Sequence, residues 1–241
     1  MKILLTVVVC GNGADGRSAP LYDGIELIYP DGGEGVKDFL ARALKTAKGK
    51  YTVVLDTKFL FADVQPLLNI IDKNTADMVC FNGGIALKTA VLKNVVKDCE
   101  DSFSCRILGV FACKNLLKTD YNPFTLERAA GAFTDENTAG LLLCAETFGR
   151  IKAKLPKEIY TYSFNCLCDR LVTYYLYAML AIREGKLTAD KLTAFDGKLK
   201  AEIVLYLALE KRFTYAKLQK LRNKEFKISW LAERKFRKVL G

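Results

Sequence analysis

The sequence predicts an α/β domain, with a mostly parallel sheet and helices on both of its faces, followed by a helical extension. Over residues 1–165, short apolar runs alternate with helical patterns, which is typical of buried strands joined by right-handed crossovers. After Asn165 the pattern changes to long helices, and no proline follows Pro156. We therefore expect an α/β domain over 1–165 and a helical part over 166–241.

The expected strands of the first part are short apolar runs, at residues 3–9, 25–29, 51–55, 78–81, 107–111 and 159–162. Between the second and third strands, apolar residues recur with helical spacing and predict a helix that closes at Gly49; they stand at positions 36, 39, 40, 43, 44 and 47. A second helix is expected over residues 64–73.

In the second part, helices are expected over residues 167–184 and 188–210, with one or two more through residue 239. One apolar stripe of the first of these helices favours a packed core over a binding surface; it comprises positions 171, 174, 175, 177, 178 and 181.

Composition indicates a globular protein of the cytoplasm. Hydrophobic residues make up 51% of the 241 residues, and no apolar run approaches the ~18–20 residues of a membrane span. The apolar N-terminal run breaks at Gly11 without an Ala-x-Ala cleavage site, so we interpret it as a strand rather than as a signal peptide. The eight cysteines are then expected to be reduced and buried. Because histidine is absent, histidine-dependent zinc sites, Ser-His triads and Cys-His dyads are excluded.

Two glycine-rich segments follow the first two strands. The Gly-x-Gly-x-x-Gly motif at 11–16 lacks the following helix that dinucleotide binding needs, which favours a loop. The second segment, DGGEG at 31–35, stands where parallel sheets bind ligands, and Asp31 could accept hydrogen bonds from a ribose or a base. A turn that needs a positive φ at a glycine explains this segment equally well.

A longer stretch carries a family resemblance. The segment PDGGEGVKDFLARALKTAKGKYTVVLDTKFLFADVQPLLNIIDKNTADMVCFN resembles the family 2 glycosyltransferases of the GT-A fold, in which a glycine loop, a helix and a strand ending in Asp-x-Asp follow one another. A second block is similar to the acceptor side of that family, with an acidic pair opening a helix; it reads GVFACKNLLKTDYNPF and then FTDENTAGLLLCAETFGRIKAKLPKEIYTYSF. The resemblance covers about residues 25–165.

The resemblance implies a nucleotide-sugar site in a GT-A-like domain. Asp31, on the loop with Gly33, would contact the nucleoside, and Asp56 would match the first acid of Asp-x-Asp, which helps hold the donor and its Mn²⁺ or Mg²⁺. Glu136, with Asp135 as the next candidate, would match the catalytic base that deprotonates the acceptor hydroxyl. An acidic first turn behind a threonine N-cap is the alternative interpretation of this pair.

The chain departs from the family pattern in two places. Only the loop at 11–24 is available where the family has a helix that walls the nucleotide pocket. Lys58 stands where the second acid of Asp-x-Asp is expected, and an ammonium group cannot ligate a divalent cation. Three interpretations of Lys58 are open. Its charge would replace the metal and neutralise the diphosphate, or it would form an ion pair with Asp56 or another acid at a site that no longer binds a sugar nucleotide, or it would be a solvated turn residue.

The C-terminal tail carries most of the net charge. Residues 211–241 hold eleven Lys and Arg against Glu225 and Glu233, a net charge of +9 out of +10 for the chain. Cations alternate there with Phe226, Trp230 and other apolar residues, which suits the anionic inner face of a membrane. A solvated helix face is the alternative, and no nucleic-acid binding motif accompanies the charge.

These patterns lead to two hypotheses. The first is a glycosyltransferase of cell-envelope polysaccharide biosynthesis, inverting and metal-independent, which transfers sugar from a nucleoside-diphosphate sugar to a cell-surface glycan or lipid-linked acceptor. The second is a catalytically inactive scaffold of the same fold that docks on a membrane or partner enzyme through its basic tail.

Overall fold

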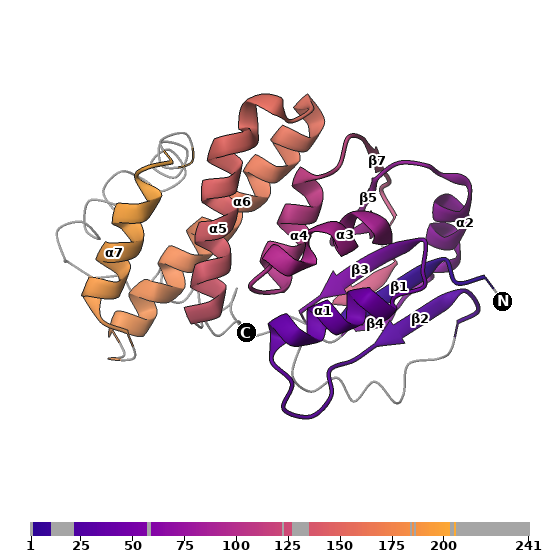
Figure 1. Ribbon diagram of the computed structural model, residues 1–241, viewed down its shortest axis with the longest axis horizontal. Coiled ribbons are helices and arrows are strands. Elements are labelled where there is room, and N and C mark those ends of the chain that lie inside the picture. The colour runs from indigo at the N-terminus through magenta and orange to yellow at the C-terminus, as the bar shows by residue number, and fades with distance from the viewer. Residues whose placement is uncertain are drawn as a thin grey trace. The chain divides into compact units, whose positions relative to one another are not determined.

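The computed structural model describes residues 2–10, 22–56, 59–121, 123–126, 135–183, 185, 187–202 and 205. The chain forms two compact units (Figure 1), the first made of Met1–Ala129 with Pro156–Ile159 and the second of Ala130–Leu155 with Tyr160–Gly241. The division therefore falls at residue 130, whereas the sequence analysis placed the domain boundary after residue 165.

The first unit is built on a six-stranded sheet, as far as the described residues show, in the order β2-β1-β3-β6-β5-β7. The strands in that order are Ile25–Ile28, Leu5–Val9, Tyr51–Leu55, Gly84–Lys88, Met78–Phe81 and Leu116–Lys118. Strand β1 is parallel to β2 and β3, and β5 is parallel to β7. Strand β6 is antiparallel to both β3 and β5. The α/β class is thus confirmed, with a mixed sheet in which one strand opposes the other five.

The antiparallel strand arises from a short turn in the sequence. Phe81 pairs with Gly84 across a two-residue connection, and Gly83 takes a φ of 91°, which favours glycine. The chain therefore returns along β5 at once instead of crossing over through a helix. A separate pair of antiparallel strands, β4 at Phe59–Phe61 and β8 at Phe124–Leu126, forms a small second sheet.

Helices cover both faces of the six-stranded sheet (Figure 1). On one face, α2 at Gln65–Lys73 packs on alternate residues of β1 and β3, with Leu67 and Ile71 fully buried. On the other face lie α1 at Val36–Thr46, α3 at Thr89–Val95 with a 3₁₀ turn at Val96–Asp98, and α4 at Ser102–Phe111. The two predicted helices of this part, at 36–47 and 64–73, are confirmed as α1 and α2.

Four of the predicted strands are confirmed as β1, β2, β3 and β5, but two are wrong. Residues 107–111 form the end of α4, which begins at a capping box between Asp101 and Ser104. Nine of the ten residues of α4 are buried, so its apolar run is as continuous as that of a buried strand. Residues 159–162 lie near the start of a long helix, α6.

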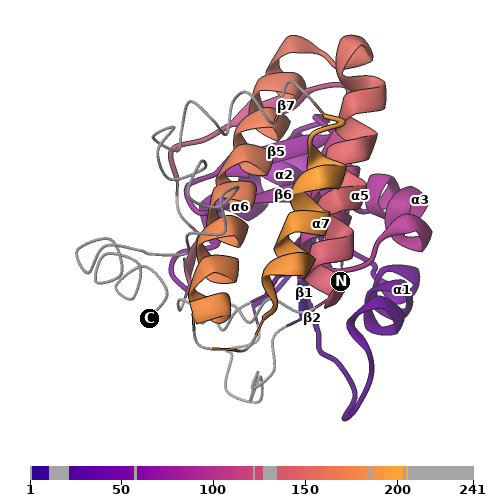
Figure 2. The same cartoon turned by 90° about the vertical axis from the view of Figure 1, so that its left-hand side faces the viewer.

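The second unit is helical (Figure 2). It contains α5 at Asp135–Ile151, a 3₁₀ turn at Lys152–Lys154, all but the first three residues of α6 at Lys157–Arg183, and α7 at Ala189–Leu199. The predicted core stripe is confirmed where Tyr174 and Tyr175 of α6 are buried against Phe195 of α7, with ring centroids 4.1 and 5.8 Å apart respectively. The helices expected beyond residue 205 lie outside the described residues. Within the described part of the chain, no helix has the length and hydropathy that a bilayer crossing requires.

Candidate functional site

Three adjacent parallel strands end at the same edge of the sheet, which we call the carboxyl edge. Strand β1 lies between β2 and β3, with Val8 beside Ile28 and Val9 beside Leu55. Asp56 follows β3 directly, and Asp31 follows β2 after two residues. Ligands of open α/β sheets bind beyond this edge. The two acids predicted to contact a nucleotide sugar therefore flank the end of the central strand.

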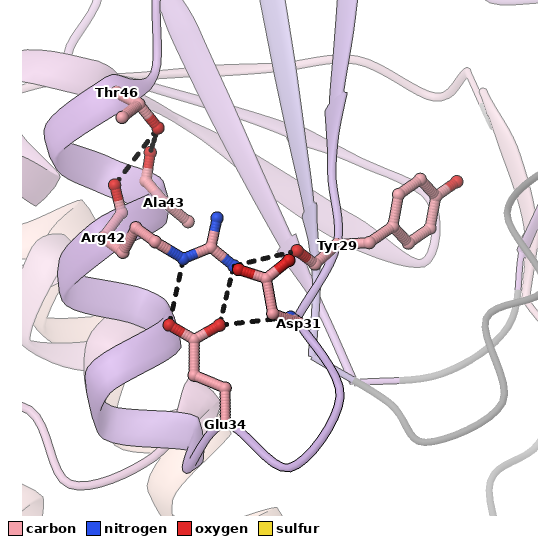
Figure 3. Close-up of polar contacts among 6 residues, drawn as sticks. All are labelled: Tyr29, Asp31, Glu34, Arg42, Ala43 and Thr46. Carbon is pink, nitrogen blue, oxygen red and sulfur yellow. Dashed lines mark hydrogen bonds and ion pairs between the residues drawn. The ribbon is translucent and has the colours of Figure 1, made fainter.

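The loop that carries Asp31 is a defined turn (Figure 3). The backbone N–H of Glu34 donates to the Asp31 carbonyl at 3.1 Å, and the Asp31 N–H donates to Glu34 Oε2 at 3.2 Å. Gly33 has a φ of 83°, a conformation that residues with a side chain rarely adopt, so the turn favours a glycine at this position. The Asp31 side chain is 80% exposed, and its carboxylate remains accessible to a ligand.

Arg42 of α1 holds this loop (Figure 3). Its Nε donates to Glu34 Oε1 at 2.9 Å, and its Nη2 donates to Glu34 Oε2 at 2.6 Å and to the Tyr29 carbonyl at 3.2 Å. The same Nη2 lies 3.3 Å from Asp31 Oδ2. The hydrogen bonds between Arg42 and Glu34 stabilise the charged form of both side chains. They lower the pKa of Glu34 and raise the pKa of Arg42. The loop is thereby fixed to α1 before any ligand binds.

At the end of β3, Asp56 is paired with Arg106 of α4. Nη1 of Arg106 donates to Asp56 Oδ1 at 2.6 Å, and Nη2 donates to Oδ2 at 2.9 Å. Nη1 also donates to the Val54 carbonyl at 3.1 Å. Burial alone would lower the pKa of Arg106, but attraction to Asp56 outweighs it and the pKa is raised. The pair stays partly accessible, because its side chains are 25% and 33% exposed for Arg106 and Asp56.

Cys10, which follows β1, stands between the two acids in the strand order. Its backbone N–H donates to the Leu55 carbonyl at 2.7 Å and so continues the pairing of β1 with β3. Burial, and then the negative charge of Asp56, raises the pKa of the Cys10 thiol. Cys10 is therefore protonated at neutral pH and is not a thiolate nucleophile.

The residues at Asp56 do not fit the divalent cation that the family resemblance implies. Both carboxylate oxygens of Asp56 accept hydrogen bonds from Arg106. A cation at these oxygens would lie beside the guanidinium and would meet its positive charge. Among the residues described, no group of three or more Cys, Asp or Glu side chains could hold a metal ion.

The remaining predicted site residues are described in part or not at all. Asp135 and Glu136 open α5 in the second unit, and their side chains lie outside the described residues, as does the N-cap alternative at Thr134. Lys58, the loop at 11–21 and the basic tail at 211–241 also lie outside them.

Sequence reasoning missed Arg106, Arg42 and Glu34. Arg106 is the one charged residue in the run SFSCRILGVF, which is a usable signal because a lone charge in a buried element needs a partner. Glu34 and Arg42 are eight residues apart, and no helical spacing rule pairs them. Comparisons of this chain with protein-family models, with curated proteins and with solved structures found no match.

Proposed function

We propose that the first unit binds a nucleoside-diphosphate sugar at the carboxyl edge and that the protein is a glycosyltransferase of the GT-A type. The acceptor would be a cell-surface glycan or a lipid-linked sugar. The observation that carries the proposal is the placement of Asp31 and Asp56 after β2 and β3, on either side of β1. This is the place where open α/β sheets bind nucleotides.

The chemistry assigned to the site is a displacement at the anomeric carbon. Asp31 accepts hydrogen bonds from the ribose or base, while the turn at Gly33 lets the backbone approach the nucleoside. The acceptor hydroxyl attacks the anomeric carbon as the bond to the diphosphate breaks, and the nucleoside diphosphate leaves. Glu136, or Asp135, takes the hydroxyl proton, a role worth roughly 10²–10⁴-fold in rate.

One observation favours a second candidate, the inactive scaffold of the same fold. The bidentate pair with Arg106 neutralises the acid that the family uses for its cation. A chain that had lost transfer chemistry would keep such a pair for stability alone. In that case the basic residues of 211–241 would serve as the docking element for an anionic membrane.

Titration of the full chain with UDP-, GDP-, CDP- and TDP-sugars, by calorimetry and by thermal shift, tests the proposal. The Asp31→Asn variant should weaken binding about 10- to 100-fold, because a hydrogen bond to a charged group is worth about 1.5–3 kcal/mol. Asp23→Asn is the matched control, since Asp23 is an exposed acid at the opposite end of the same strand. Failure to bind any of these nucleotides would contradict the proposal.

Binding alone does not separate the enzyme from the scaffold, so transfer is tested with Glu136→Gln. This variant should keep the affinity of the wild-type chain for the donor while losing at least 100-fold in transfer or donor hydrolysis. Donor binding without turnover in the wild-type chain would favour the scaffold.

A further inference from the structure

The guanidinium of Arg106 has donors left over from its contacts with Asp56. An arginine offers five N–H groups in a rigid plane. Three of them are used: both Nη1 hydrogens bind Asp56 Oδ1 and the Val54 carbonyl, and one Nη2 hydrogen binds Asp56 Oδ2. Among the residues that the structure describes, no acceptor contacts Nε–H or the second Nη2–H. These two donors lie on the same side of the guanidinium and match two oxygens of one phosphate.

The charges around Arg106 allow an anion there. In an Asp-x-Asp site a divalent cation is balanced by two carboxylates, which leaves no net charge. Here Asp56 is balanced by Arg106, so the ion pair itself carries no net charge. The other acid near Arg106, Asp101, is buried as the N-cap of α4, where its Oδ1 accepts from the Ser104 N–H at 2.7 Å. The amino end of α4 offsets that charge.

From this arrangement we infer that Arg106 takes the place of a divalent cation at the carboxyl edge. It anchors Asp56 with one pair of donors and binds a phosphate of the donor diphosphate with the other. Arginine suits this role, because its charge is permanent and its planar fork binds phosphate in a bidentate manner. The inference rests on the proposed binding of a nucleoside-diphosphate sugar and adds that this binding needs no metal.

The test measures nucleotide affinity of the full chain with EDTA and with Mn²⁺, using the same panel of sugar nucleotides. We expect the Kd to agree within about twofold in the two buffers. Arg106→Gln should weaken binding about 10-fold or more, because it removes a charged hydrogen-bond donor. Arg150→Gln, at an exposed arginine of α5, is the control and should not change the Kd.

Asp56→Asn separates the two roles, because they predict different results. If Arg106 binds the phosphate, the Kd of Asp56→Asn should be the same in EDTA and in Mn²⁺, because the positive charge of Arg106 remains. If Asp56 ligates a cation, the wild-type chain should bind more tightly in Mn²⁺, and Asp56→Asn should lose this gain. This variant also keeps the experiment decisive if Arg106→Gln does not fold, as judged by circular dichroism. A requirement for Mn²⁺ in the wild-type chain that is lost in Asp56→Asn would overturn the inference while leaving nucleotide binding established.

Two simpler probes, inorganic pyrophosphate and Mn²⁺, test the role of Arg106 separately from the binding of a sugar nucleotide. Inorganic pyrophosphate should bind the wild-type chain in EDTA and bind Arg106→Gln at least several-fold more weakly, even if no sugar nucleotide binds. Mn²⁺ alone, followed by electron paramagnetic resonance, should show no stoichiometric binding that depends on Asp56. Absence of pyrophosphate binding, or Mn²⁺ binding that is lost in Asp56→Asn, would refute the role of Arg106.

Discussion

Arg106 and Asp56 form a bidentate ion pair that joins α4 to the end of β3, with Nη to Oδ distances of 2.6 and 2.9 Å. We expect a coupling energy of about 1–2 kcal/mol between them, less than the 3–5 kcal/mol cost of breaking a fully buried pair, because both side chains are partly exposed. A double-mutant cycle of Arg106→Ala and Asp56→Ala, followed by urea unfolding, measures it. Additive effects of the two changes would show that the pair contributes nothing.

The pair of Glu34 and Arg42 should make the loop at 31–35 sensitive to acid. Because the pKa of Glu34 is lowered in the folded state, its contribution to stability is present above the unfolded value and is lost as the pH falls through the folded value. The melting temperature of the wild-type chain should therefore exceed that of Glu34→Gln at pH 7, and the difference should shrink as the pH falls below the unfolded pKa of a glutamate and through the lowered pKa of Glu34. Glu146→Gln, at an exposed position of α5, is the control. A difference that does not depend on pH would contradict the role given to this pair.

Two neighbouring glycines of the same loop should respond differently to alanine. Gly33 has a φ of 83°, and an alanine there should cost about 1 kcal/mol in the free energy of unfolding. Gly32 has no positive φ of this kind and nothing within 4 Å of a Cβ, so Gly32→Ala should be nearly neutral. Denaturant unfolding of both variants measures this difference, and equal costs would show that the turn is not the reason for Gly33.

Gly49 lies so close to β1 that a side chain cannot be added without movement. A Cβ at this position would lie 2.4 Å from the backbone nitrogen of Thr6, and the Gly49 N–H donates to Thr6 Oγ1 at 2.9 Å. Gly49→Ala should destabilise the first unit by about 2–3 kcal/mol in thermal or urea unfolding. Gly197→Ala in α7 is the contrast, because nothing lies within 4 Å and helical alanine is favoured by about 0.5–1 kcal/mol. The same small effect at both positions would refute the close approach.

The side chain of Lys50 caps the C-terminal end of α2. Its Nζ donates to the carbonyls of Ile71, Asp72 and Asn74 at 2.7, 2.9 and 2.7 Å. Helix ends leave such carbonyls without partners, and a cation there is favourable. Lys50→Met should therefore lower the free energy of unfolding by about 1–2 kcal/mol, whereas Lys45→Met, at an exposed position of α1, should change it little. Equal melting temperatures of the two variants would contradict the capping role.

The spacing of apolar residues was sufficient to predict helices with one buried and one exposed face. It was also sufficient for short apolar strands that are bounded by turns. The stripe at Phe39, Leu40 and Ala43 predicted α1, and all three side chains are buried against the sheet. It was insufficient for α4, because an element buried on all sides has a continuous apolar run whether it is helix or strand. Strand β6 was missed, although Asn82-Gly83 between the apolar runs MVCF and GIALK is a strong signal for a two-residue hairpin.

The residues of the candidate site also fall into those that the sequence predicted and those that it did not. The order of strands and loops along the chain was enough to expect Asp31 and Asp56 after the ends of two strands, and in the sheet these strands lie on either side of β1. The sequence also presented Lys58 as a residue that does not suit a metal. It did not show that Arg106, fifty residues after Asp56, would occupy both oxygens of that acid.

The sequence by itself therefore determined the α/β class, the main helices and strands of the first unit, the helical second unit and the two acids that follow β2 and β3. These depend on local period and turn chemistry, which act over a few residues. Only the tertiary structure decided the fixing of the Asp31 loop by Arg42 and the pairing of Asp56 with Arg106. Each of these contacts depends on which surfaces meet when the helices pack on the sheet. A charged group that becomes buried needs an oppositely charged partner close to it in space, and that partner can lie anywhere along the chain.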